Sequence, residues 1–298
     1  MHGWIIIDKP VGPGSTNIVG AVKRALRDGD YPKVKVGHGG TLDPLASGVL
    51  PIALGEATKL SGRMLDADKI YDFTIAFGVE TDTLDGEGVE VARSDVRPSP
   101  GAVDDILPRF TGPIEQVPPA YSALKVDGKR AYAMARAGEA PVMKPRAVVV
   151  HDLVRLADGD TGLSLETVTL RARVSKGTYI RSLARDIASA LATVGHVAML
   201  RRVKAGPFAL NDAISLDKLA ELAKARQLEQ ALLPLTAGLD DIPALSVTPD
   251  QASLLRKGRK LAGIAAEPGL HLAIDQSVPV ALVELSEGEL RVVRGFNL

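Results

Sequence analysis

Residues 36–51 read Val36-Gly37-His38-Gly39-Gly40-Thr41-Leu42-Asp43-Pro44-Leu45-Ala46-Ser47-Gly48-Val49-Leu50-Pro51. Three glycines within four positions let the backbone approach a ligand or another segment closely, and Pro44 restricts the conformations open to Asp43 before it. The adjoining run 49–54 is apolar enough to form a buried strand. Because a polar, glycine-rich loop anchored on a buried strand is a common place for functional side chains, we predict that Asp43 belongs to an active site.

The whole chain has the composition of a soluble protein. Its 298 residues are enough for one large domain and a smaller one, and 46% of them are apolar. No stretch is as long and apolar as a transmembrane helix requires, and no signal peptide is evident, so we expect a cytoplasmic protein without a membrane partner. The absence of cysteine excludes disulfides and thiolate metal sites, and the five histidines lack the spacing of a metal site.

The charge is balanced overall but unevenly distributed. The 36 basic and 36 acidic residues give a net charge of zero, which by itself argues against a nucleic-acid partner. However, the segment 171–210 holds eight basic residues and one acid, whereas the segment 72–117 holds ten acids and three arginines. We therefore expect the two segments to lie on different surfaces, with the basic one either facing RNA or simply solvated.

The pattern of apolar residues predicts a helix at 15–26, capped by Ser15 or Thr16, together with several strands. The strands are expected at 5–7, 49–54, 71–77, 147–156, 163–174 and 197–203. Because several of them follow one another without a helix between, we predict an α+β fold with a mixed, largely antiparallel sheet and helices packed on it. The basic segment 125–146 has few bulky apolar residues and is expected to be an exposed arm.

The character of the chain changes near residue 240. Asp240-Asp241-Ile242-Pro243 reads as a linker, and short strand-like runs follow at 271–274, 278–285 and 290–293. We therefore expect a large domain over 1–240 and a small, turn-rich β domain over 241–298.

Further motifs together with residues 36–51 identify a family resemblance. They are Ile7-Asp8-Lys9-Pro10, Gly55-Glu56-Ala57-Thr58-Lys59, Asp68-Lys69-Ile70-Tyr71, Tyr121-Ser122-Ala123-Leu124-Lys125, Ser175-Lys176-Gly177-Thr178-Tyr179-Ile180-Arg181 and His196-Val197-Ala198-Met199-Leu200-Arg201-Arg202. In this order they resemble the TruB family, the tRNA pseudouridine-55 synthases. The resemblance implies a pseudouridine synthase fold over 1–240 with a thumb-like arm at about 125–146, and a PUA-like RNA-binding domain over 241–298. It also implies an isomerase that flips one uridine out of the T-loop of tRNA without a cofactor. No metal is expected, and nothing in the sequence demands more than a monomer without an obligate protein partner.

The same resemblance assigns roles to individual residues. Asp43 is expected to be the nucleophile and Arg181 the residue that keeps it ionised, since an adjacent opposite charge favours the charged carboxylate. Tyr71 is expected to stack on the flipped uracil and to take part in the chemistry. The remaining substrate-binding residues implied are His38, Tyr179, Leu200, Lys9, Lys176 and Arg202. Lys9 either meets phosphate or orders the catalytic loop, and attack at C1′, addition to C6 and removal of a sugar proton all remain open as routes for Asp43.

Three other interpretations remain open at this stage. Gly12-Pro13-Gly14-Ser15 suggests a dinucleotide-binding turn, but Asn17 occupies the third glycine position and the signal is weak. A nucleoside or glycoside hydrolase would need a second catalytic acid, for which Asp8 and Glu56 are the candidates. A non-catalytic RNA-binding module would use the basic segment and not Asp43.

Overall fold

The structure, a computed structural model, describes residues 1–122, 124–126, 128–139, 141–156 and 163–298. Ala123 of one quoted motif, and residues 127 and 140 of the expected arm, lie outside the described residues. Within these ranges no helix combines the length and the apolarity needed to cross a membrane.

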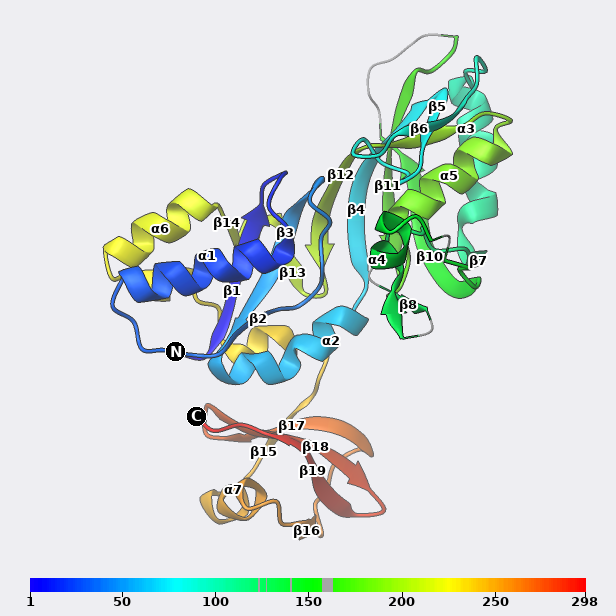
Figure 1. The fold of residues 1–298 in the computed structure, drawn as a ribbon. Coiled ribbons are helices and arrows are strands. Elements are labelled where there is room, and N and C mark those ends of the chain that lie inside the picture. Colours follow the sequence, from blue (N-terminus) through cyan, green and yellow to red (C-terminus); the bar gives the residue numbers. More distant parts are fainter. Residues whose placement is uncertain (123, 127, 140, 157–162) are drawn as a thin grey trace.

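In the described part of the chain, ten strands form one large mixed sheet (Figure 1). They are β1 (Gly3–Lys9), β2 (Val36–His38), β3 (Ala46–Leu54), β4 (Lys69–Phe77), β7 (Gly112–Gln116), β10 (Arg146–Arg155), β11 (Thr167–Val174), β12 (Gly195–Ala205), β13 (Phe208–Ala209) and β14 (Ala213–Ile214). The main path runs β14-β1-β3-β12-β4-β11-β10-β7, with β2 on β3 and β13 on β12. The β1–β14 and β12–β3 pairs are parallel and the other pairs in this sheet are antiparallel, which confirms the predicted α+β class.

Strands β1 and β3 are buried on both faces, which explains why their sequences are continuously apolar rather than alternating. One face packs against α1 (Ser15–Asp28) and α6 (Leu216–Lys224) in an apolar cluster that includes Ile5, Leu50 and Ile18. The opposite face packs against η1 (Gly55–Leu60) and η5 (Leu235–Gly238). Trp4 is the largest side chain of this second face, and its indole N–H donates to the carbonyl of Leu235 at 3.2 Å.

The other half of the sheet has its own core. Strands β4, β10 and β11 pack against α5 (Ile180–Ala190) and α3 (Pro100–Ile106), and η2 (Leu107–Phe110) closes the end of this cluster. Tyr71 of β4 and Leu200 of β12 pack against the cores of both halves. These two side chains therefore mark the junction between the two cores, and β4 and β12 lie between the halves in Figure 1.

A second sheet is built from the C-terminal residues. Its order is β15-β17-β18-β19-β16. The bounds are β15 (Ala244–Ser246), β16 (Leu261–Ala262), β17 (Gly269–Asp275), β18 (Val278–Ser286) and β19 (Glu289–Gly295), and α7 (Pro249–Arg256) packs on it. Leu272, Leu282 and Phe296 join the same apolar cluster as Trp4 of the large sheet. The RNA-binding role of this unit stays a prediction.

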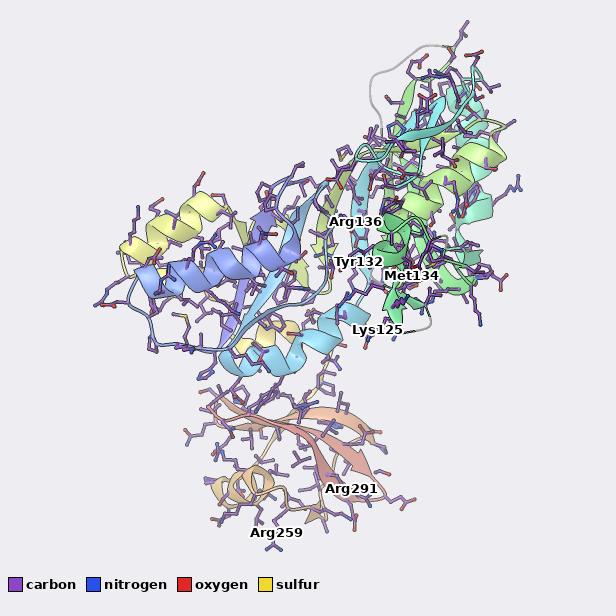
Figure 2. The ribbon with its side chains drawn as sticks, viewed as in Figure 1. Lys125, Tyr132, Met134, Arg136, Arg259 and Arg291 are labelled. Atoms are coloured by element: carbon purple, nitrogen blue, oxygen red, sulfur yellow. The ribbon has the colours of Figure 1, made fainter. Side chains whose placement is uncertain are left out.

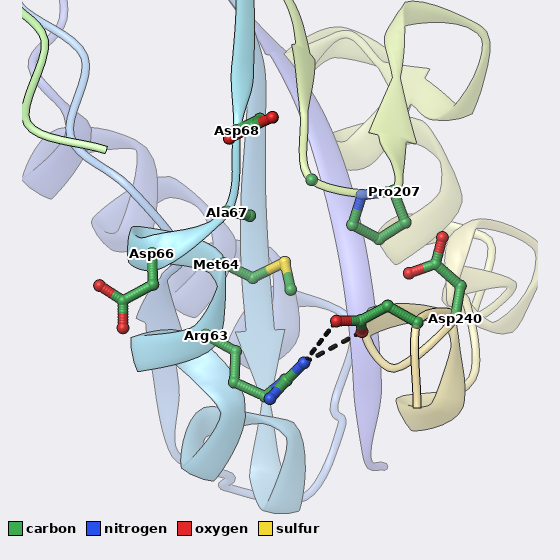
Figure 3. A pocket seen from close by; sticks show the side chains of 9 residues that line it. Arg63, Met64, Asp66, Ala67, Asp68, Pro207 and Asp240 are labelled. Carbon is green, nitrogen blue, oxygen red and sulfur yellow. Dashed lines mark hydrogen bonds and ion pairs between the residues drawn. The ribbon is translucent and has the colours of Figure 1, made fainter. Parts of the chain in front are cut away.

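Polar contacts join the second sheet to the segment of η1 and α2 (Ser61–Asp66). Lys59 donates to the carbonyl of Gly295 at 2.9 Å, and the carboxylate of Glu56 accepts from the N–H of Asn297 at 2.8 Å. Arg63 makes two hydrogen bonds to Asp241 at 2.8 and 3.0 Å (Figure 3).

The remaining elements refine the sequence-based expectations. The strand expected at 163–174 begins only at Thr167, because Leu165 leaves the strand path to bury its side chain, with its N–H donating to the carbonyl of Pro98. The expected arm carries a short hairpin, β8 (Lys125–Val126) with β9 (Lys129–Arg130), followed by α4 (Ala131–Arg136). A further hairpin pairs β5 (Val79–Thr81) with β6 (Glu90–Arg93), and single turns of helix lie at η3 (Leu210–Asp212) and η4 (Leu228–Ala231).

Replacing Trp4 by Ala should lower the free energy of unfolding by about 3–5 kcal/mol, because a fully buried indole would leave a cavity and the carbonyl of Leu235 would lose its donor. Chemical denaturation monitored by circular dichroism measures this loss. Leu254→Ala is the matched control, since that side chain is 42% exposed and its loss should cost little. Equal effects of the two substitutions would contradict the assignment of Trp4 to the core.

Candidate active site

A cavity of about 310 Å³ opens where the two cores of the large sheet meet. Its walls include six of the residues predicted from the sequence: Asp43, Tyr71, Tyr179, Arg181, Leu200 and Arg202. Lys69 also lines the cavity. These residues are contributed by segments far apart in the chain. The structure thus brings together in one cavity the aspartate, the arginine and two of the tyrosines expected to act together.

The loop that carries Asp43 is fixed by buried polar contacts. The ammonium of Lys9 is fully buried and donates to the carbonyl of Pro10 and to those of Pro44 and Ala46, the first and third residues after the aspartate. The hydroxyl of Ser15 donates to the carbonyl of Leu42 at 3.0 Å and accepts from its N–H at 2.8 Å. Of the two roles expected for Lys9, the structure therefore supports the ordering of the loop.

Arg181 forms the electrostatic centre of the site. It lies in the first turn of α5, and its side chain is 8% exposed. Its Nη2 lies 2.9 Å from Oδ2 of Asp43, which is 43% exposed at the mouth of the cavity. Its Nη1 lies 3.4 Å from Oδ2 of Asp85, and the two Nη groups also donate to the carbonyls of Thr83 and Tyr121. These contacts fix the direction of the guanidinium, so the arginine can hold the Asp43 carboxylate in one place.

Asp85 is a site residue that the sequence analysis missed. Its carboxylate is buried and accepts from the hydroxyl of Thr83 and, at 3.1 Å, from the N–H of Glu87. The preceding Leu84 has φ +62°, a left-handed conformation that costs about 1 kcal/mol or more for a side chain of this kind. A strained residue beside a buried carboxylate indicates that this turn is shaped to present Asp85 and the Thr83 carbonyl to Arg181.

The pairing also corrects the expected separation of charged segments. Asp85 belongs to the acidic segment and Arg181 to the basic one, yet they form an ion pair. Asp72 and Arg171 are a second such pair, at 2.7 Å, because β4 and β11 are neighbours in the sheet with these two residues in register. The expectation that the two segments lie on different surfaces is therefore wrong, and sheet pairing is the reason.

Two tyrosines and one leucine form the apolar walls. Tyr71 and Leu200 enter from β4 and β12, whereas Tyr179 is the residue that precedes α5. The backbone of Tyr179 is held on both sides by the buried amide of Gln116, which accepts from its N–H at 2.7 Å and donates to its carbonyl at 3.0 Å. Burial raises the pKa of the Tyr179 hydroxyl, so this ring is a neutral wall at physiological pH.

Lys176 and Arg202, two cationic residues expected to bind substrate, differ in exposure. Lys176 is exposed and pairs with Asp66 at 2.9 Å. Arg202 is 1% exposed, and its nitrogens donate to the carbonyls of Val49, Thr41 and Gly40. Arg202 therefore lies in the wall of the cavity and not on the surface of the protein.

His38 is half-buried on β2, and its Nδ1 atom is buried without a hydrogen-bond partner in the described chain. Burial, and then the neighbouring Arg202, lower the pKa of its imidazole. His38 is thus a neutral ring behind the glycine-rich loop.

The two acids considered for a hydrolase lie elsewhere. Asp8 pairs with Arg201 at 2.8 Å, and Glu56 pairs with Lys59 next to the second sheet. Neither lines the cavity that holds Asp43. In addition, no cluster of three or more His, Asp or Glu side chains suited to a metal ion occurs in the described part of the chain.

Comparison with known proteins gives consistent matches. Residues 27–180 match a family model described as TruB family pseudouridylate synthase (N terminal domain), and residues 181–240 match tRNA pseudouridylate synthase B C-terminal domain. Proteins named tRNA pseudouridine synthase B are 63% identical in Novosphingobium aromaticivorans and 60% identical in Zymomonas mobilis, over 100% of this chain and 98% and 96% of theirs. A crystal structure of a Cbf5-Nop10-Gar1 complex contains a chain with TM-score 0.73 and 26% identity, covering 99% of this chain and 84% of that one.

Replacing Lys9 by Met should destabilise the protein by about 2 kcal/mol, because Met fills the space but leaves the carbonyls of the loop that carries Asp43 without their buried donor. Thermal unfolding measures the change. Lys260→Met is the control, since that lysine is exposed and paired with Glu289 on the second sheet. An unchanged melting temperature for Lys9→Met would show that its ammonium does not hold the loop.

Proposed function

Because the chain belongs to the TruB family of pseudouridylate synthases, we propose that it converts uridine 55 in the T-loop of tRNA to pseudouridine. The observation that supports this most directly is the ion pair between Asp43 and Arg181 at the mouth of a cavity walled by Tyr71, Tyr179 and Leu200. A carboxylate held by a fixed arginine beside apolar and aromatic walls suits the attack on a nucleotide whose base has left its stack.

The reaction requires one bond to be exchanged for another. The bond between N1 of uracil and C1′ of ribose breaks, a bond between C5 and C1′ forms, the hydrogen at C5 leaves as a proton, and N1 ends protonated. The reaction is not a net oxidation or reduction, so it requires no redox partner. Asp43 can attack C1′, add to C6 or remove a sugar proton, and its position supports all three.

The apolar walls can offset the free-energy cost of base flipping. Removing a base from its stack costs a few kcal/mol, which replacement stacking on protein side chains offsets. We propose that Tyr71 stacks on the uracil, with Tyr179 and Leu200 enclosing it from the other elements. The volume of about 310 Å³ is adequate for a pyrimidine nucleoside.

Arg181 and Asp85 act as a unit that positions Asp43. Because Arg181 shares its guanidinium between two carboxylates, removal of Asp85 would leave its Nη1 edge held only by the carbonyl of Thr83 and therefore less firmly fixed. The aspartate would then lose its fixed direction, although it would keep an arginine nearby. Asp85 is therefore proposed as a positioning residue and not as a catalytic acid.

The alternative functions have less support. A hydrolase would need a proton-donating acid across the cavity, but the nearby Asp85 is an acceptor for three groups, and Asp8 and Glu56 lie outside the cavity. A dinucleotide-binding turn at 12–15 is not followed by a βαβ unit, since β1 pairs antiparallel with β3. A non-catalytic RNA-binding module would have no use for a buried arginine aimed at Asp43.

The exposed basic side chains favour contact with the RNA outside the cavity. Figure 2 shows Lys125, Tyr132, Met134 and Arg136 on the arm, Arg291 on β19 of the second sheet, and Arg259 between α7 and β16. We propose that the arm of about 125–146 closes over the T-loop, with Lys176 near the cavity and the domain of 241–298 on the RNA outside it. We further propose that the protein acts in the cytoplasm as a monomer without an obligate protein partner.

The variant Asp43→Asn should bind unmodified tRNA nearly as tightly as the parent protein but should release no tritium from uridine labelled at C5. The amide has nearly the same shape, but it has lost the nucleophile. Tritium release measures turnover, and mapping of the modified position in a transcript incubated with the parent protein tests position 55. Turnover by Asp43→Asn would refute the role of Asp43, and modification at another position would refute the substrate assignment.

Replacing Asp85 by Asn should lower kcat roughly tenfold to a hundredfold with little change in tRNA affinity, since misplacement of a reacting group by about 1 Å has effects of this size. Single-turnover kinetics and filter binding separate the two quantities. The matched control is Asp104→Asn, which also breaks a bidentate pair with an arginine, Arg155, but on the surface and away from the cavity. If the two variants retain the same kcat, Asp85 has no positioning role.

A further inference from the structure

Two cations on one wall of the cavity have no carboxylate partner in the described chain. Lys69 is 7% exposed and Arg202 is 1% exposed, and both line the cavity that holds Asp43. Lys69 donates to the carbonyls of Leu65 and Ala67 at 2.7 and 2.6 Å. The partners of Arg202 are likewise carbonyl oxygens. Such partners satisfy hydrogen bonds but do not neutralise charge.

The acids closest to Lys69 are engaged by other cations. Asp66 pairs with Lys176 at 2.9 Å. Asp68 pairs with Arg173 at 2.9 Å and also lies 3.2 Å from His151. These two acids favour the charged form of Lys69 from a distance, whereas Arg202 and Lys176 oppose it. Burial is the largest cause of the lowered pKa of Lys69, which is about 8, so a bound anion would stabilise its charged form further.

Donor capacity remains for such an anion. An ammonium has three N–H bonds and Lys69 uses two of them on carbonyls. A guanidinium has five N–H bonds, and the three hydrogen bonds of Arg202 leave one on each terminal nitrogen. Two neighbouring cations with free donors match the several acceptor oxygens of a phosphodiester.

The spacing of Lys69 and Tyr71 on β4 indicates which part of the flipped nucleotide would reach Lys69. Lys69 and Tyr71 are two residues apart on β4, so their side chains emerge on the same face about 7 Å apart along the strand. This spacing is comparable with the separation between the base and the phosphate of one nucleotide. A base stacked on Tyr71 would therefore bring a flanking phosphate to Lys69.

We propose that Lys69 and Arg202 form a phosphate subsite for one of the two phosphodiesters that flank the target uridine. The inference rests on the proposed function, because it takes the ligand of the cavity to be a uridine in RNA. Lys69 adds a contact to the substrate that does not belong to the catalytic pair, and it selects a nucleotide within a chain over a free nucleoside.

The test combines one protein change with one RNA change. Binding is measured in the Asp43→Asn background, so that the target uridine is not consumed, to a T-arm stem-loop RNA carrying a single uncharged methylphosphonate on the 5′ or the 3′ side of that uridine. One of the two RNAs should bind the protein with Lys69 roughly tenfold to a hundredfold more weakly than the unmodified RNA, the effect of losing a hydrogen bond to a charged group. The added change Lys69→Met should abolish most of this difference, whereas Lys69→Arg should retain it.

Lys218→Met is the matched control, since this lysine pairs with Glu221 on the exposed face of α6, and it should leave the full sensitivity to the methylphosphonate. The salt dependence of binding should fall by about one counterion in Lys69→Met and not in the control. If Lys69→Met does not fold, Lys69→Gln, which retains a donor without the charge, takes its place with the same expectation.

Two results would overturn the subsite: no effect of either methylphosphonate with Lys69 present, or an equal effect with and without Lys69. Failure of the proposed function gives a different result, because the parent protein would then leave the unmodified RNA unchanged in the tritium assay.

Discussion

The geometry of the site depends on one arginine shared between two carboxylates. Arg181 can hold Asp43 in a fixed direction only because Asp85 and two carbonyls hold the arginine. These partners come from three segments, the residues around Tyr121, the turn at 81–85 and the loop after β2, so all three must be in place around the first turn of α5. The buried side chains of Lys9 and Ser15 hold the loop after β2 in place through hydrogen bonds to its carbonyls.

The large sheet explains why such segments meet. Its two halves have separate apolar cores, and the side chains of Tyr71 and Leu200 contact both. Since side chains at the junction are not fully covered by either core, a cavity opens there. The polar groups required for chemistry can then stand at the edge of apolar surface without being enclosed by it.

Much of this arrangement can be predicted from the sequence. The apolar runs of β1 and β3 and the glycine-rich loop between β2 and β3 predict a buried strand and an exposed aspartate, and a family resemblance supplies the roles of Tyr71 and Arg181. Asp85 could not be predicted in this way, because its role depends on a contact with a residue almost a hundred positions away. The local pattern of apolar residues does not reveal which distant elements come into contact. The burial of Arg202 could not be predicted for the same reason. A run of basic residues predicts an exposed segment, and only the neighbouring strands of the folded protein enclose this arginine.

The composition of the chain predicts a domain boundary near residue 240, but the apolar packing continues across that boundary. Leu272, Leu282 and Phe296 complete the apolar cluster that contains Trp4, so the N-terminal strand is partly covered by the C-terminal sheet. A fragment that ended at this boundary would expose that surface to water and would tend to aggregate. The two sheets therefore have separate strand orders, but neither is an independent soluble piece. During synthesis on the ribosome, the first strand stays incompletely covered until the last one has emerged.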